Sequence, residues 1–239
     1  MSQPSEQKAT SAPSRTAIKI GGTEYNLEVS KMPYLASFTH FQVNAQPQTA
    51  EFVHGSIPLF EVALKGIESG YRQCFRSIPT DLSQHHTLCE TYEFLCVNVL
   101  GGQSITDIFA DLKSGRTQFD YEVTRGDKSK ARDASFRFLY LMLLGEFSDE
   151  VKDSAKVYNA VLYVVSHPGT FKWRTRTVIR AACEERFILS DKQRASLDKW
   201  RRGEAAKLAA DRDEDEDEDV TTEEEWDNDV DEYYGSDFS

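Results

Sequence analysis

The residues best suited to chemistry are a histidine and a cysteine one helical turn apart, His85 and Cys89. Residues four apart share a helical face, so the two side chains could act as a nucleophile and its base. A reactive thiolate also needs an exposed, positively charged setting. Cys89 instead shares an apolar stripe with Leu82, Tyr92 and Cys96. The pattern therefore favours a buried thiol that packs as a small hydrophobic group.

The other catalytic and ligand-binding patterns are also incomplete or absent in this sequence. Structural zinc takes four ligands. The candidates here are His85, His86, Cys89 and Cys96, and only two or three of them could meet on one helical face. Gly21-Gly22 lacks the third glycine and the following helix of a dinucleotide-binding motif. The sequence has neither a phosphate-binding P-loop nor a Gly-x-Ser-x-Gly motif. We therefore expect a protein that is not an enzyme and takes no metal or cofactor.

The negative charge of the chain is concentrated near its C-terminus. The 239 residues are 39% hydrophobic and carry a net charge of −12. Residues 204–239 hold 17 acidic residues against Lys207 and Arg212, a net charge of −15, which leaves +3 for residues 1–203. Like charges repel, and this segment has almost no aliphatic residues. We predict a disordered acidic tail after a folded body of about 200 residues.

Several features bear on where the protein resides. The four cysteines show no paired spacing of the disulfide-scaffold kind, which indicates a reducing compartment. No apolar run approaches the roughly 20 residues needed to span a bilayer. Residues 1–16 are polar, resemble no secretory signal, and are predicted to be disordered. We expect a soluble protein of the cytoplasm, the nucleus or both, without a membrane partner.

Residues 17–102 have the pattern of a small α+β domain. Alternating apolar residues flank Gly21-Gly22, which predicts a two-stranded hairpin. Ser30 should cap a helix that runs to Phe41, and a short apolar strand should follow at 50–54. The inward positions of that helix are predicted to be Met32, Leu35, Phe38 and Phe41.

Two further helices complete this predicted domain. Pro58 should open the first, and Gly70 should end it. The second should run from Asp81 to Leu100, with Cys96 among its inward positions, and Gly101-Gly102 should end it.

The chain beyond Gly102 is predicted to be all-helical. Ser104 and Asp107 resemble a capping box, and Gly115 should end the short helix they open. Residues 130–147 are apolar nearly all round, so this helix should be central to a bundle. Further helices are expected at 151–165, at 175–189 and from a capping box at Ser190. The predicted organisation is a disordered 1–16, an α+β domain 17–102, a helical extension 103–203 and an acidic tail 204–239.

Four motifs follow one another in the first part of the chain: Ile18-Lys-Ile-Gly-Gly-Thr-Glu-Tyr25, Ser30 to Phe38, Pro58 to Gly70, and Leu88 to Val97. Taken together, they resemble a BTB/POZ domain of the branch that includes potassium-channel tetramerisation domains. The first motif resembles the opening strand and turn of that branch, and the second is similar to the helix that follows it. The last two resemble its two later helices, and all four motifs occur in the family's order.

The resemblance implies a function as well as a fold. BTB/POZ domains bind proteins and carry no chemistry of their own. They pair with themselves, and many dock onto a cullin scaffold of a ubiquitin ligase while the rest of the chain selects a substrate. The implied function is a protein-binding adaptor, with a homo-oligomer and a cullin as candidate partners. The helical extension would then enlarge the binding platform.

A second candidate surface lies in the basic segment 171–203, with 10 basic and 4 acidic residues. Its cations and its aromatic residue gather at a predicted helix start, at Lys172, Trp173, Arg174, Arg176 and Arg180. Three interpretations stay open: a solvated face with Trp173 in the core, a dock for the acidic tail, or nucleic-acid binding. The last would make the chain a chromatin or nucleic-acid-associated regulatory protein, which is the alternative function.

The acidic tail also carries candidate binding residues. Trp226, Tyr233 and Tyr234 stand among acidic residues, a pattern typical of short motifs that bind a basic, apolar groove. Acidic residues follow Thr221, Thr222 and Ser236, which makes these hydroxyls candidates for phosphorylation. A solubilising tail without any partner is the plain alternative.

Overall fold

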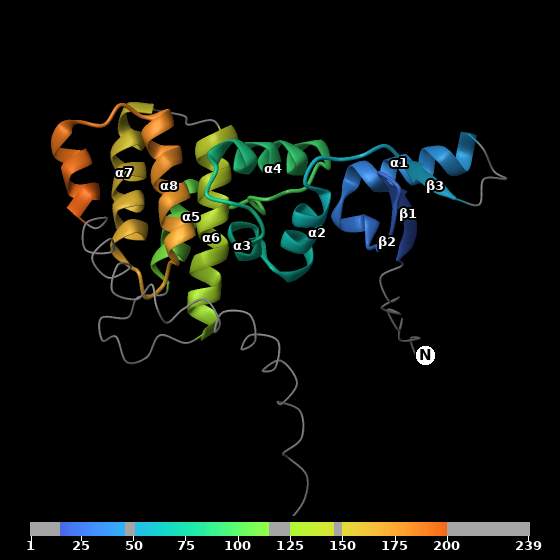
Figure 1. Ribbon diagram of the computed structural model, residues 1–239, viewed down its shortest axis with the longest axis horizontal. Coiled ribbons are helices and arrows are strands. Elements are labelled where there is room, and N and C mark those ends of the chain that lie inside the picture. Colours follow the sequence, from blue (N-terminus) through green and yellow to red (C-terminus); the bar gives the residue numbers. More distant parts are fainter. Residues whose placement is uncertain (1–14, 46–50, 115–124, 146–149, 200–239) are drawn as a thin grey trace, which may run out of the picture. The chain divides into compact units, whose positions relative to one another are not determined.

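The computed structural model describes residues 15–45, 51–114, 125–145 and 150–199 (Figure 1). Contacts divide the chain into two units, residues 1–189 and 190–239. The protein is α+β, with mostly helical structure and one small sheet. The predicted acidic tail and almost all of the predicted N-terminal disordered segment lie outside the described residues.

A three-stranded sheet begins the fold, with strands in the order β2-β1-β3. The predicted hairpin is confirmed: β1 (Thr16–Ile20) runs antiparallel to β2 (Thr23–Leu27). Gly21 and Gly22 form the turn with positive φ angles of 57° and 97°, a conformation that glycine adopts without steric cost. The predicted short strand is also present, as β3 (Phe52–His54), parallel to β1.

The first helix differs from its prediction in two ways. Ser30 does not cap it, because Ser30 lies inside a 3-10 helix, η1 (Val29–Lys31), that precedes α1 (Pro33–Ala45). The helix also continues one turn beyond Phe41, whose side chain was predicted to face inward but is 66% exposed. Leu35 and Thr39 are the buried positions of α1, so its buried face covers only the first two turns.

Three helical segments follow β3. The helix predicted from Pro58 to Gly70 is present as α2 (Phe60–Ser69), but Pro58 does not open it, because Leu59, between Pro58 and the helix, has a left-handed φ of 50°. Two short segments that the sequence did not predict come next, η2 (Tyr71–Gln73) and α3 (Cys74–Ser77).

The long helix of this part is shorter than predicted. It forms α4 (Leu82–Phe94) and stops before Leu100, because Cys96 has a left-handed φ of 55° that an α-helix does not accommodate. This turn also places the side chain of Cys96, predicted to face inward, on the surface.

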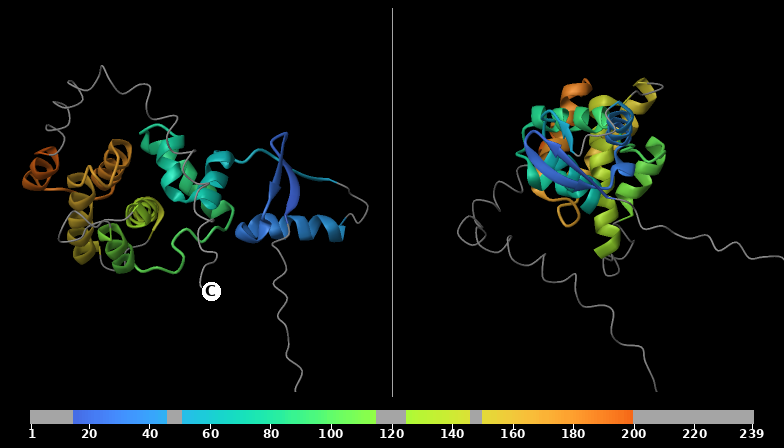
Figure 2. Two further views of the ribbon diagram at one scale, coloured as in Figure 1. Left: turned by 90° about the horizontal axis from the view of Figure 1, so that it is seen from below. Right: turned by 90° about the vertical axis from the view of Figure 1, so that its right-hand side faces the viewer.

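The remaining helices of the first unit include α5 (Ile105–Lys113), α6 (Arg125–Leu144), α7 (Glu150–Ser166) and α8 (Trp173–Arg186). Helix α6 packs against α5 and α8, while α7 packs against α8. Phe136, Phe138 and Leu139 of α6 are fully buried, which confirms its predicted central place. Figure 2 shows α6, in yellow-green, nearly end-on beside α5 and α8, both of which contact it. None of the described helices has the length and apolar character to cross a bilayer.

Both predicted capping boxes are confirmed. The Ser104 hydroxyl accepts from the Asp107 backbone N–H, and the Asp107 carboxylate accepts from the Ser104 backbone N–H. In the second unit, Gln193 accepts from the Ser190 backbone N–H at 2.9 Å, where a helix over 191–199 begins. Each box satisfies N–H groups that lack partners within the helix.

Candidate interaction surfaces

Four aromatic rings adjoin one another beside α1, those of Tyr34, Phe38, His54 and Phe94, and Phe41 shares their helical face without a ring contact to them. Tyr34, Phe38 and Phe41 are spaced at i, i+4 and i+7, which places them on one helical face. The Tyr34 ring lies 4.4 Å from the Phe94 ring, and the Phe38 ring lies 5.1 Å from the His54 ring, measured between centroids. We call these five residues the aromatic stripe; it joins α1 to β3 and to the end of α4.

Hydrogen bonds fix the middle of the aromatic stripe. His54 Nδ1 lies 2.8 Å from the Gly55 carbonyl oxygen, to which only an N–H can donate. In the neutral imidazole the hydrogen is therefore on Nδ1, and Nε2 accepts from the Tyr34 hydroxyl at 2.9 Å. Both rings are thus held in place without a partner, so little side-chain freedom would be lost on binding.

The ends of the aromatic stripe are open to solvent. Phe41 is 66% exposed and Phe94 is 46% exposed. A single exposed apolar side chain is ordinary on a protein surface, whereas large contiguous apolar patches mark interaction sites. Aromatic residues are enriched at the centres of protein–protein interfaces, where they supply large rigid contact areas. The aromatic stripe therefore has the composition of a protein-binding surface.

The predicted basic surface is only partly present. Lys172 precedes the first turn of α8 and is exposed, and Trp173 is 47% exposed rather than packed in the core. Arg174 is exposed too, and its guanidinium donates to the backbone carbonyl of Arg76 at 3.0 Å. These three neighbours remain accessible at the start of the helix.

The other two predicted cations of this surface are held by the protein itself. Arg176 is buried at 6% exposure and donates to the Val165 carbonyl, so it does not reach the surface. Burial lowers the pKa of Arg176. Arg176 lies on the buried face of α8, because the helical period turns its side chain away from the exposed side chains at the start of the helix. Arg180 pairs with Glu184 at 2.8 Å. The predicted binding residues Trp226, Tyr233 and Tyr234 lie outside the described residues.

The predicted Cys89 and His85 pair has no catalytic geometry. Cys89 is fully buried, and burial raises the pKa of its thiol, so the thiol stays protonated at neutral pH. His85 Nδ1 donates to the Asp81 carbonyl at 2.9 Å, and burial lowers the pKa of the imidazole. No hydrogen bond joins the two side chains. Among the described residues, no group of three or more histidine, cysteine, aspartate or glutamate side chains could hold a metal ion.

The aromatic stripe contains three residues that were not predicted from the sequence as binding residues, Tyr34, His54 and Phe94. Tyr34 lies at the expected spacing from Phe38 and Phe41, so an aromatic period along 34–41 was the available signal. His54 and Phe94 come near these residues only in the folded chain, so no local pattern indicates them. Comparisons with known proteins do not add to this account: no family model, no curated protein and no solved structure matches the chain.

Proposed function

We propose that this chain is a non-enzymatic adaptor that binds proteins through the aromatic stripe. The observation that carries the proposal is the stripe itself, in which adjoining rings from α1, β3 and α4 lie at the surface. A buried, protonated thiol at Cys89 is consistent with a protein that performs no nucleophilic chemistry.

The order of the elements supports a BTB/POZ-like assignment. A hairpin, a helix, a strand parallel to β1, a second helix and a longer helix follow one another from β1 to α4. This is the order that the sequence resemblance implies. The candidate partners are accordingly a second copy of the chain and a cullin scaffold, and the remaining surface would select a substrate.

The size of the aromatic stripe sets a limit on its role. An aromatic side chain buries about 150–250 Å² when fully covered, and a specific interface buries at least about 1,000 Å² in total. The half-exposed rings of the stripe can therefore form the centre of an interface but not all of it. Polar residues around the stripe would complete the contact, as the rims of protein interfaces do.

Nucleic-acid binding by the basic segment has weaker support. Five residues were candidates, but Arg176 is buried and Arg180 pairs with Glu184. Lys172, Trp173 and Arg174 remain on the surface. Three adjacent residues give a smaller footprint than the extended basic face typical of nucleic-acid-binding domains.

Two measurements on the full chain test the proposed function. Size-exclusion chromatography with light scattering, over a range of concentrations, should show a dimer or a larger oligomer, or a pull-down should capture a cullin. A chain that stays monomeric at all concentrations and captures no cullin contradicts the proposal. DNA or RNA binding that appears only after truncation at Gly203, and weakens steeply with salt, would instead favour the alternative.

A further inference from the structure

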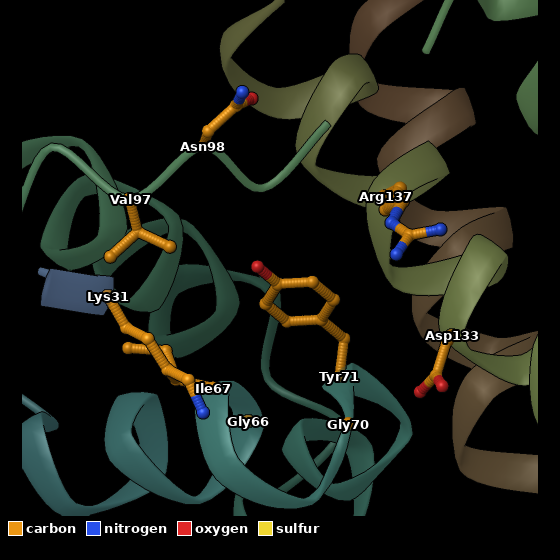
Figure 3. A pocket seen from close by; sticks show the side chains of 9 residues that line it. All are labelled: Lys31, Gly66, Ile67, Gly70, Tyr71, Val97, Asn98, Asp133 and Arg137. Carbon is orange, nitrogen blue, oxygen red and sulfur yellow. The ribbon is translucent and has the colours of Figure 1, made fainter. Parts of the chain in front are cut away.

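A cavity of about 400 Å³ opens between α2, the loop after α4 and α6 (Figure 3). Ile67 and Val97 give it an apolar wall, and hydrogen-bond donors come from Lys31, Tyr71 and Arg137. Its volume is within the range of small-molecule and side-chain binding sites. Neither the aromatic stripe nor the basic segment contributes to it.

Tyr71 presents its hydroxyl to this cavity. Figure 3 shows the ring projecting into the space between Lys31, Asn98 and Arg137. Burial raises the pKa of Tyr71, so the hydroxyl keeps its proton at neutral pH and can donate it in a hydrogen bond. The structure shows no hydrogen-bond partner for this hydroxyl within the described residues. One face of the Tyr71 ring stacks on the Phe136 ring, with centroids 5.5 Å apart, and this contact fixes the orientation of Tyr71.

Arg137 brings a positive charge that no carboxylate in the described part of the chain pairs with directly. Its guanidinium carbon lies 5.8 Å from the centre of the Tyr71 ring, and its Nη1 donates to the neutral amide oxygen of Gln103 at 2.9 Å. Its Nε is buried without a hydrogen-bond partner. Beyond Gln103 lies Asp111, whose carboxylate is already paired with Lys130 at 2.9 Å.

The acidic group on the cavity wall does not offset this surplus of donors. Asp133 accepts from the backbone N–H of Arg72 at 2.8 Å and from its guanidinium at 3.2 Å. Each oxygen of Asp133 thus accepts one bond from Arg72, whose guanidinium balances the negative charge. Lys31 adds a second cation on the opposite wall, although Glu28 pairs with it at 3.0 Å.

We propose that this cavity binds a carboxylate group, with Arg137 and Tyr71 donating hydrogen bonds to its oxygens. The planar guanidinium matches the geometry of a carboxylate, and hydrogen bonds to a charged acceptor are the stronger kind. Ile67 and Val97 contact the short apolar stem that carries the carboxylate. The ligand is either a free dicarboxylate or an acidic side chain of a peptide. This site goes beyond the proposed adaptor function, because it is separate from the aromatic stripe.

Ligand-observed NMR and calorimetric titration of the full chain test the proposal. The probes are glutarate, the peptide Glu-Glu-Glu-Trp, and glutaramide as the uncharged equivalent of glutarate. We expect glutarate or the peptide to bind and glutaramide not to bind. Binding of glutarate assigns the site to a free dicarboxylate, and binding of the peptide alone assigns it to an acidic protein segment.

Two variants and a control identify the site. Tyr71→Phe keeps the ring on Phe136 and removes only the hydroxyl, so it should fold normally and bind about tenfold more weakly. Arg137→Gln removes the charge and should weaken binding more. Lys113→Gln, which removes an exposed cation on α5 away from the cavity, should bind as the unaltered chain does. Absence of binding by either acidic probe, equal binding of glutaramide, or unchanged binding by a folded Tyr71→Phe variant would overturn the proposal.

Discussion

The ring of Tyr71 lies parallel to the ring of Phe136, with centroids 5.5 Å apart and planes 12° apart. Phe136 also meets Tyr92 and Phe75 edge-on, at 5.7 and 5.8 Å between centroids. One residue of α6 thus contacts η2, α3 and α4. The helical part after Gly102 supplies the surface against which the preceding part packs these rings.

Replacing Phe136 should therefore destabilise the whole first unit. Phe136→Ala removes a fully buried ring and leaves a cavity, so it should lower the free energy of unfolding by about 3–5 kcal/mol. Denaturant titration followed by circular dichroism measures this. Val43→Ala, at a site 53% exposed and outside the aromatic stripe, is the control and should change the value by less than about 0.5 kcal/mol. Equal small effects of both variants would show that α6 does not stabilise residues 17–102.

Gly66 should not tolerate a side chain. A methyl group there would overlap the Tyr92 hydroxyl and the Cys74 sulfur, two buried atoms that lie 3.3 Å apart. Gly66→Ala should therefore cost about 1–3 kcal/mol of unfolding free energy through overpacking. Gly55→Ala, where the added methyl group meets nothing within 4 Å, should cost less. Thermal unfolding of the two variants compares them, and equal melting temperatures would contradict the close packing at Gly66.

The four cysteines should differ sharply in reactivity. Burial raises the pKa of Cys74 and of Cys183 to about 12 and also raises the pKa of Cys89, whereas Cys96 is exposed. Iodoacetamide at neutral pH should alkylate Cys96 first, because reaction requires an accessible thiolate. Peptide mass spectrometry before and after denaturation identifies the modified residues. Rapid alkylation of Cys89 in the folded chain would revive the hypothesis of a nucleophilic cysteine.

Asp111 should contribute to stability in a pH-dependent way. Burial alone would raise its pKa, but hydrogen bonds from Lys130 and Gln103 outweigh burial and lower it. A lowered folded-state pKa means that the stabilisation is present at neutral pH and is lost as the pH falls through that pKa. Asp111→Asn should therefore cost about 1 kcal/mol at pH 7, since Lys130 is half exposed, and less in acid.

Denaturant titrations at neutral and acidic pH measure this difference for Asp111→Asn. Glu68→Gln is the control, because Glu68 is an exposed carboxylate on α2 for which the described structure gives no ion pair. Its effect should be small at both pH values. A deficit of the Asp111→Asn variant that grows in acid would have the wrong sign for a lowered pKa.

Local signals in the sequence predicted much of the fold. The Gly21-Gly22 turn, the Ser104 and Ser190 capping boxes and the apolar character of α6 each act over a few residues, and each prediction is confirmed. The end of α4 was missed because Cys96 adopts a left-handed conformation that its residue type does not indicate. The short helices η2 and α3 were missed because tertiary packing, rather than a long apolar period, stabilises them.

The surfaces were harder to predict than the elements. Periodicity shows which face of a helix is apolar, but not what covers that face. Phe41 was expected inside for this reason and is exposed, whereas Arg176 was expected at the surface and is buried. The cavity near Tyr71 depends on α6, and the bond from Arg72 to Asp133 joins residues 61 positions apart. No local pattern encodes such a pairing.

We propose above all that this chain meets other proteins through the aromatic stripe. Light scattering on the full chain and its Phe41→Ser variant, with capture of a cullin measured in parallel, tests it most directly. Val43→Ser is the control, because Val43 is 53% exposed but lies on another side of α1. We predict that the unaltered chain and Val43→Ser associate alike, while Phe41→Ser loses self-association or capture. Association by Phe41→Ser at the strength of the unaltered chain would contradict the account.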